Sequence, residues 1–189
     1  MPGQFVENIS IESSKQPLLS LAMIVKNGGK LFTELLDEAR PWVDEILVGD
    51  TGSIDNSNKS AVDRGAFVIP IVWNDDFSAA RNEVLEQCSG RWILVLDADE
   101  RISPDHWQQL RVLVQEKSEY QAKSVLRFKL RHENSESKNG EGWSQIHSPG
   151  GVFPSRIIRL FPNDKNIRFE GCFRESVEDS AVSSDFRVV

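Results

Sequence analysis

The sequence lacks the features that define several large classes of protein. It has only two cysteines, Cys88 and Cys172, which are too few for a disulfide framework or a thiolate zinc site and fit a reducing compartment. Its longest apolar run, Leu18 to Val25, falls far short of the roughly 20 residues that a membrane-spanning helix needs. The start has neither the basic segment nor the apolar stretch of a secretory signal. We therefore expect a cytoplasmic protein without a transmembrane segment.

Positive charge is also scarce. Lysine and arginine number 22 against 29 aspartates and glutamates, which gives a formal net charge of −7 at pH 7. This balance opposes a mechanism that relies on a broad basic surface, so neither nucleic acid nor an anionic membrane is expected as a partner. The hydrophobic share of 39% and the charged share of 27% are ordinary for a folded globular chain. Function must therefore be sought in motifs.

The length of 189 residues favours one domain with a substantial core. Residues 1–16 are polar and are expected to form a flexible tail, so the domain is expected to span residues 17–189. Its last five residues are largely apolar, and we expect a longer protein to continue beyond them.

In the first half of the chain, short apolar runs alternate with amphipathic stretches. This pattern indicates strands joined by crossover helices in a mostly parallel sheet, and the near-continuous hydrophobicity of the runs indicates helices on both faces. The expected strands are 18–25, 45–49, 67–72 and 92–96, and the expected helices are 30–40, 56–64, 78–88 and one of about three turns beginning at Pro104. Three tryptophans on or beside these elements are expected to be structural: Trp73, Trp92 and Trp107.

The second half changes character. Strands are expected at 124–131, 156–161 and 167–169 without helices between them, so this half should be mixed or antiparallel. Residues 133–151 are rich in Ser, Asn, Gly and charge, and they predict a long mobile loop.

The fourth expected strand ends in a cluster of carboxylates, Asp97-Ala98-Asp99-Glu100. Strand geometry sends Asp97 and Asp99 to one side, at the strand end where open α/β sheets bind ligands. Two close carboxylates repel each other unless a cation offsets their charge, and Mg²⁺ or Mn²⁺ is the natural partner of such oxygen ligands. The alternative is that both aspartates only cap the turn into the next helix. An isolated Asp-x-Asp is common, but its position here favours a metal.

Three segments together resemble one family. Residues 44–55, Asp-Glu-Ile-Leu-Val-Gly-Asp-Thr-Gly-Ser-Ile-Asp, look like the second-strand motif of family 2 glycosyltransferases, and residues 76–82, Asp-Phe-Ser-Ala-Ala-Arg-Asn, resemble the helix start after their third strand. With residues 92–100, their order is similar to the branch that carries Asp-Ala-Asp-Glu. The resemblance covers roughly residues 18–175. It implies an α/β protein of GT-A fold, the fold of nucleotide-diphospho-sugar transferases, with a mostly parallel central sheet, helices on both faces and a mixed second half.

The resemblance also implies a nucleotide-diphosphate sugar as donor, held in the half that spans 17–101, with the acceptor side in 102–189. The residues implied in donor binding are Asp50, Thr51, Gly52, Ser53, Arg81, Asp97 and Arg174. A divalent metal, Mg²⁺ or Mn²⁺, would bind Asp97 and Asp99. A guanidinium suits a diphosphate, although an ion pair of Arg81 with Asp76 or Asp99 is the alternative.

The late segment 167–175 is more loosely similar to the family pattern, which usually ends Gly-x-x-His-Glu. Arg174 stands where the histidine is expected, and it can either contact the diphosphate or form a surface ion pair. Glu175 closes the motif and is the favoured catalytic base for the acceptor hydroxyl, with Glu100 as the second candidate. The family resemblance implies inversion at the sugar.

Two rival classes stay open. A nucleotidyltransferase would carry a glycine-rich, basic triphosphate loop near its start, and Asn27-Gly28-Gly29-Lys30 is too slight for that. A domain that binds nucleotide sugar or glycan without turnover is favoured by the departure at Arg174. The acceptor of a transferase would be a glycan, a lipid or a protein.

Overall fold

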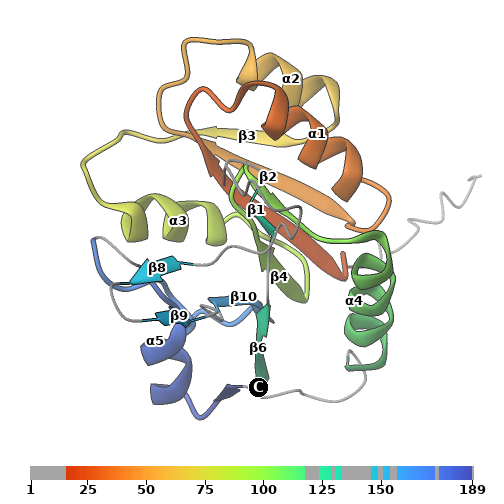
Figure 1. The fold of residues 1–189 in the computed structure, drawn as a ribbon, viewed down its shortest axis with the longest axis vertical. Coiled ribbons are helices and arrows are strands. Elements are labelled where there is room, and N and C mark those ends of the chain that lie inside the picture. Colours follow the sequence, from red (N-terminus) through yellow and green to blue (C-terminus); the bar gives the residue numbers. More distant parts are fainter. Residues whose placement is uncertain are drawn as a thin grey trace, which may run out of the picture.

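A seven-stranded sheet runs through the middle of the molecule, with helices on both of its faces (Figure 1). The structure is a computed structural model that describes residues 16–117, 124–128, 131–132, 146–148, 151–153, 157–172 and 175–188. The strand order is β11-β6-β10-β4-β1-β2-β3. The predicted tail lies outside the described residues except for Gln16.

The first half of the chain supplies four parallel strands. They are β1 (Leu19–Val25), β2 (Glu45–Asp50), β3 (Phe67–Pro70) and β4 (Trp92–Val95). Strand β1 lies between β2 and β4, and β3 adds to the outer edge of β2, all in parallel register. The sequence pattern predicted all four within two residues of their observed ends. Chain order therefore reverses beside β1, which is the topology that opens a crevice at the carboxyl ends of the strands.

Helices cover the two faces of the sheet in separate groups. The helices are α1 (Gly29–Ala39), α2 (Ser57–Asp63), α3 (Phe77–Leu85), α4 (Pro104–Lys117) and α5 (Glu178–Ser183). Buried residues of α1, α2 and α4 pack in one core cluster, and those of α3 and α5 pack in the other. Helix α1 shows why: its apolar residues recur every three or four positions and form one buried stripe. Among the described residues, no helix is long and apolar enough to cross a membrane.

Two of the three tryptophans are structural, as predicted. Trp92 and Trp107 are buried in the core cluster that contains α1 and α4. Trp73 fits the prediction only in part, because it packs against the other cluster but is partly exposed and lines the cleft described below.

The second half is mixed, as the sequence predicted. Strand β10 (Ile157–Pro162) runs antiparallel to both β4 and β6 (Ser124–Phe128), and β11 (Arg187–Val188) runs parallel to β6. Two short pairs complete the described strands: β5 (Glu100–Arg101) with β7 (Arg131–His132), and β8 (Ile146–Ser148) with β9 (Gly151–Phe153). Most of the predicted loop, residues 133–145, lies outside the described residues, and β8 and β9 begin within its remainder.

The strand predicted at residues 167–169 is wrong. This segment joins no ladder, and only an isolated bridge between Glu170 and Ser176 follows it. The backbone N–H and C=O groups of Phe169 bond instead to the side chain of Asn82 on α3, each at 2.9 Å. The alternating apolar pattern therefore marks a segment that docks on a helix.

Candidate functional site

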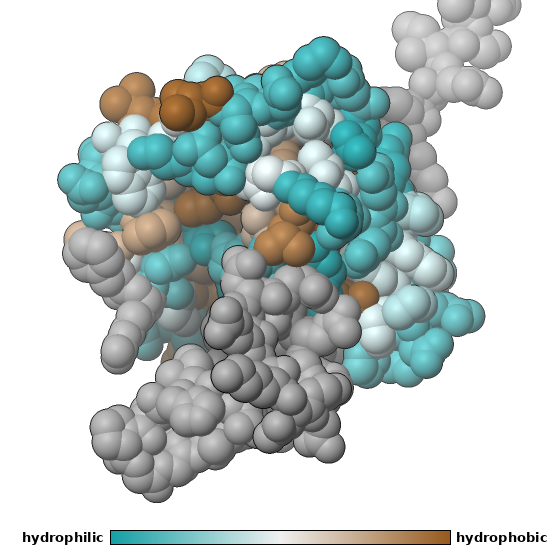
Figure 2. Space-filling view, turned by 45° about the horizontal axis from the view of Figure 1, so that its top comes forward, coloured by the Kyte–Doolittle hydropathy of each residue, from teal (hydrophilic) through white to brown (hydrophobic). Residues whose placement is uncertain are grey.

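A cleft of about 500 Å³ opens where β1, β2 and β4 end. Figure 2 shows this face of the molecule, with brown apolar and teal polar surface meeting inside a hollow. The cleft is lined by Ile24, Val25, Lys26, Thr51, Trp73, Phe77, Arg81, Asp97 and Glu175. Mostly apolar walls with a few converging polar groups are typical of small-ligand sites, and this strand end is where open α/β sheets bind ligands.

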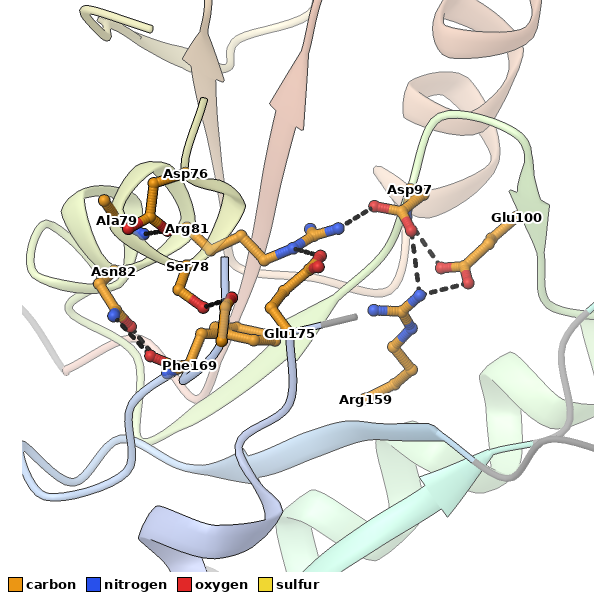
Figure 3. A network of polar contacts seen from close by, with 11 residues as sticks. Asp76, Ser78, Ala79, Arg81, Asn82, Asp97, Glu100, Arg159, Phe169 and Glu175 are labelled. Carbon is orange, nitrogen blue, oxygen red and sulfur yellow. Dashed lines mark hydrogen bonds and ion pairs between the residues drawn. The ribbon is translucent and has the colours of Figure 1, made fainter. Parts of the chain in front are cut away.

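Arg81 is the central cation of the cleft. Its side chain is only 6% exposed; Nη2 donates to Asp97 Oδ1 at 2.6 Å, and Nε donates to Glu175 Oε1 at 2.8 Å. Figure 3 shows Arg81 reaching from α3 between these two carboxylates. Its remaining nitrogen, Nη1, is buried and has no hydrogen-bond partner among the residues that the structure describes. An unsatisfied guanidinium nitrogen at the wall of a cleft is suited to an anionic ligand.

A second guanidinium lies on the other side of Asp97. Arg159 Nη2 lies 3.0 Å from Asp97 Oδ2 and 2.5 Å from Glu100 Oε1. Glu100 is fully buried, and its Oε2 accepts the backbone N–H of Asp97 at 2.8 Å. Glu100, Arg159, Asp97, Arg81 and Glu175 thus form a row of alternating charges, which we call the charged row (Figure 3).

The pKa values of the two acids that contact Arg159 are shifted in opposite directions. Burial opposes ionisation of Asp97, but the guanidiniums of Arg81 and Arg159 outweigh it and hold the pKa of this carboxyl below its ordinary value. Burial raises the pKa of Glu100 in spite of Arg159, and the nearby charge of Asp97 raises it further. The surroundings therefore favour the ionised form of Asp97 and disfavour that of Glu100.

The motif of residues 76–82 builds the site from one helix. Asp76 caps α3 by accepting the backbone N–H of Ala79 at 3.0 Å, while Ser78 Oγ donates to the carbonyl of Gly171 at 2.6 Å. With the two bonds of Asn82 to Phe169, these contacts dock the late segment on α3 and bring Glu175 to Arg81. The ion-pair alternative considered for Arg81 is correct in kind, but the partners are Asp97 and Glu175.

The polar groups of the turn after β2 mainly stabilise the turn itself. Asp50 accepts the backbone N–H of Ser53 at 3.0 Å and the amide of Asn58 at 2.9 Å, while Gly52 adopts a φ of +100°, which favours glycine. Of the four residues 50–53 that were predicted to meet the nucleotide, Thr51 lines the cleft, and the other three do not belong to its lining.

The carboxylates after β4 are the side chains that the sequence predicted as metal ligands. Asp97 is a third exposed and Asp99 is also partly exposed, so their oxygens match the ligands that Mg²⁺ and Mn²⁺ prefer. Both oxygens of Asp97 already face guanidiniums, however. Within the described residues, no cluster of three or more Asp, Glu, His or Cys side chains stands ready to hold an ion. The residues therefore fit a metal that takes its other ligands from a bound molecule or water. Arg174 lies outside the described residues.

Sequence reasoning missed two features of the site. The role of Arg159 was not predicted; its only signal is a lone cation between apolar residues of a strand. Trp73 and Phe77 form an aromatic wall, with ring centroids 4.8 Å apart at an interplanar angle of 71°, and Trp73 Nε1 donates to Asp75 at 2.9 Å. A tryptophan just after a strand gave no hint of that wall.

Known proteins share both the sequence pattern and the fold. The family model for glycosyl transferase family 2 matches residues 20–166. A TPR repeat-containing protein of Synechococcus elongatus is 36% identical over 165 residues, which are 87% of this chain and 36% of that protein. The SPbeta prophage-derived glycosyltransferase SunS of Bacillus subtilis is 32% identical over 101 residues, 50% of this chain and 23% of SunS. The chain thus spans about a third or less of the length of these relatives.

Among solved structures, S. aureus TarS 1–349 superposes with a TM-score of 0.60 and 21% sequence identity, over 90% of this chain and 57% of that one. The sheet order, the cleft at the strand ends and this likeness define a GT-A glycosyltransferase fold, as the sequence predicted. The chain belongs to glycosyltransferase family 2.

Proposed function

We propose that this domain moves a sugar, of the hexose class, from a nucleoside-diphosphate sugar to an acceptor hydroxyl, with inversion and with the help of Mg²⁺ or Mn²⁺. The acceptor would be a glycan, a lipid or a protein. The observation that carries the proposal is the buried, unpartnered Nη1 of Arg81 in a cleft that also holds Asp97 and Glu175.

The donor diphosphate is the ligand that best fits Arg81. A buried donor without a partner costs about 1–3 kcal/mol, and a phosphate oxygen would remove that cost through a charge-assisted hydrogen bond. Glu175 and Asp97 hold the other two guanidinium nitrogens, so Nη1 is fixed in position before the ligand arrives. Thr51 and the aromatic wall of Trp73 and Phe77 would bound the rest of the donor.

Asp97 and Asp99 are the residues that would hold the metal. A bound divalent ion would neutralise charge that develops on the departing diphosphate. Arg81, which contacts Asp97, would add to that effect because its guanidinium remains cationic throughout the reaction. Leaving-group stabilisation would thus be shared between Arg81 and a cation held by the carboxylates of the turn after β4.

Glu175 is the better candidate for the base that accepts the proton of the acceptor hydroxyl. It lines the cleft, with one oxygen held by Arg81, whereas Glu100 is fully buried and paired with Arg159. A base must reach the proton that it removes, and burial denies this to Glu100. Attack from the face opposite the diphosphate would invert the sugar.

UDP is the first nucleotide to test, since TarS has been crystallised in complex with UDP. Calorimetry with and without Mn²⁺ would compare the wild type with Asp99→Asn and with Asp105→Asn, which removes an exposed carboxylate in the first turn of α4. We expect Mn²⁺-dependent UDP binding in the wild type and in the control, and at least a tenfold loss in Asp99→Asn. Affinity that is independent of Mn²⁺ in all three proteins would contradict the metal site.

A second candidate is a domain that binds nucleotide sugar without turnover. The specific observation in its favour is that guanidiniums already engage both oxygens of Asp97, which competes with metal binding. Release of UDP from UDP-hexoses, followed over hours in the presence of Mn²⁺, separates the two candidates. An enzyme shows release that Glu175→Gln abolishes, whereas a binding domain shows none.

A further inference from the structure

Arg159 occupies an irregular position in strand β10. The register against β6 shifts between Ile158 and Leu160: these residues face Arg127 and Leu126, so Arg159 is the extra residue of a β-bulge. Its neighbours on both sides, Ile158 and Leu160, are buried in opposite core clusters. Bulges occur often beside active sites, where they redirect a side chain that a regular strand would place elsewhere.

Burying the charged side chain of Arg159 costs free energy, which is unfavourable if the residue only stabilises the fold. The residue is 5% exposed, and its Nε is buried without a hydrogen-bond partner in the described part of the chain. Removing two opposite charges from water costs about as much as their attraction returns, and apolar residues often fill such positions with equal or greater stability. A role in stabilising the fold therefore does not account for a guanidinium at this point.

Arg159 does not belong to the lining of the cleft, whereas Asp97 does. It reaches the site through one contact, Nη2 to Asp97 Oδ2 at 3.0 Å, while Arg81 holds Oδ1 from the other side at 2.6 Å (Figure 3). Held at both oxygens, the carboxylate of Asp97 is fixed about its side-chain torsions. Glu100, which also contacts Arg159, in turn accepts the backbone N–H of Asp97.

We propose that Arg159 is a positioning residue of the donor site, which fixes the carboxylate of Asp97 and, through it, the guanidinium of Arg81 that meets the nucleotide diphosphate. This inference rests on the proposed function. It assigns to the antiparallel second half of the chain a direct part in shaping the nucleotide site. Without Arg159, the Asp97 carboxylate would be held by Arg81 on one side only and could rotate.

The test removes the contact without leaving a buried charge behind. Arg159→Gln alone would strand Glu100 in the core, so the informative pair is Glu100→Gln and the double variant Glu100→Gln/Arg159→Gln. Calorimetry with UDP and Mn²⁺ compares the two, and both are measured again with Asp97→Asn added. Arg111→Gln, which breaks the ion pair with Asp44 at the opposite end of the sheet, is the matched control.

We expect the double variant to bind UDP about tenfold more weakly than Glu100→Gln, the scale of one charge-assisted hydrogen bond. With Asp97→Asn present, Arg159→Gln should cause no further loss, because the residue acts through that carboxylate. Arg111→Gln should bind UDP as the wild type does. A structural role would lower the melting temperature and weaken binding equally in both backgrounds.

Two results would overturn the inference: equal UDP affinity of Glu100→Gln and the double variant, or a tenfold loss that persists with Asp97→Asn. If the wild type itself binds no UDP in the presence of Mn²⁺, the proposed function falls and this inference falls with it. That outcome is distinct, since the failure of the inference alone leaves wild-type binding intact.

Discussion

Replacing Asn82 by alanine tests whether one side chain holds the late segment on α3. Asn82 Nδ2 donates to the carbonyl of Phe169, and its Oδ1 accepts the N–H of the same residue, both at 2.9 Å. These two bonds pair the backbone N–H and C=O groups of residue 169, as a neighbouring strand pairs those of a residue in a sheet. The variant leaves both backbone groups without that partner, six residues before Glu175.

The expected cost follows from the count of bonds. Each partly buried hydrogen bond contributes about 1 kcal/mol, so the loss of two amounts to about 2 kcal/mol in the free energy of unfolding. For a chain of this size, that corresponds to a fall of about 4–8 °C in melting temperature. Release of UDP from a UDP-hexose should fall further than UDP affinity does, because Glu175 is displaced while Arg81 stays on its helix.

Urea denaturation and a UDP-release assay measure the two effects. Asn166→Ala is the control, since residue 166 is exposed and its substitution should change stability by less than about 0.5 kcal/mol. Hydrogen exchange should quicken at residues 169–176 and remain slow in β1. If Asn82→Ala unfolds within about 0.5 kcal/mol of the wild type, the reasoning that this side chain replaces a strand is refuted.

Three further predictions concern the rest of the fold. Trp107→Ala should cost roughly 3–5 kcal/mol in urea denaturation because the side chain is 2% exposed, and a loss below about 1 kcal/mol would contradict its place in the core. Hydrogen bonds from Arg111 lower the pKa of Asp44 from its ordinary 3.8, so the stabilising effect of Asp44 is complete above pH 3.8 and disappears as the pH falls through the lowered pKa. Asp44→Asn should therefore lose less free energy of unfolding than the wild type between pH 5 and pH 2. An equal loss in both proteins would contradict this. Burial raises the pKa of Cys88 to about 12, so iodoacetamide at pH 8 should modify the exposed Cys172 and spare Cys88 until urea is added, as mass spectrometry can check.

The parallel half of the fold was predictable because its signals are local. Each strand is a short apolar run ended by a turn residue, and each helix repeats its apolar residues at helical spacing. The segment 167–169 shows the limit of that reasoning. Ile167 and Phe169 alternate with Arg168 as strand residues do, but the backbone of Phe169 bonds to a side chain 87 residues away.

The sequence predicted which acids lie at the site, but it did not predict which arginines they contact. A run of carboxylates after an apolar strand predicts acids at the ligand-binding edge of the sheet, and Asp97 does line the cleft. The sequence could not reveal that Asp97 is held between two arginines, because Arg159 comes from an antiparallel strand 62 residues later and turns toward it only through a bulge. Contacts of that kind depend on register, which local patterns do not encode.

The charged row also bears on the order in which the protein is made. A ribosome synthesises about 5–20 residues per second, so Arg159 follows Asp97, 62 residues earlier, by about 3–12 s. During that interval β4 has no β10 beside it, and Glu100 lacks the cation that accompanies it into the core. A nascent chain in this state exposes an open strand edge, which is a template for pairing with another chain, beside acids whose charge opposes that pairing. The cleft at the strand ends is therefore among the last parts of the domain to mature, although most of the residues that line it emerge first.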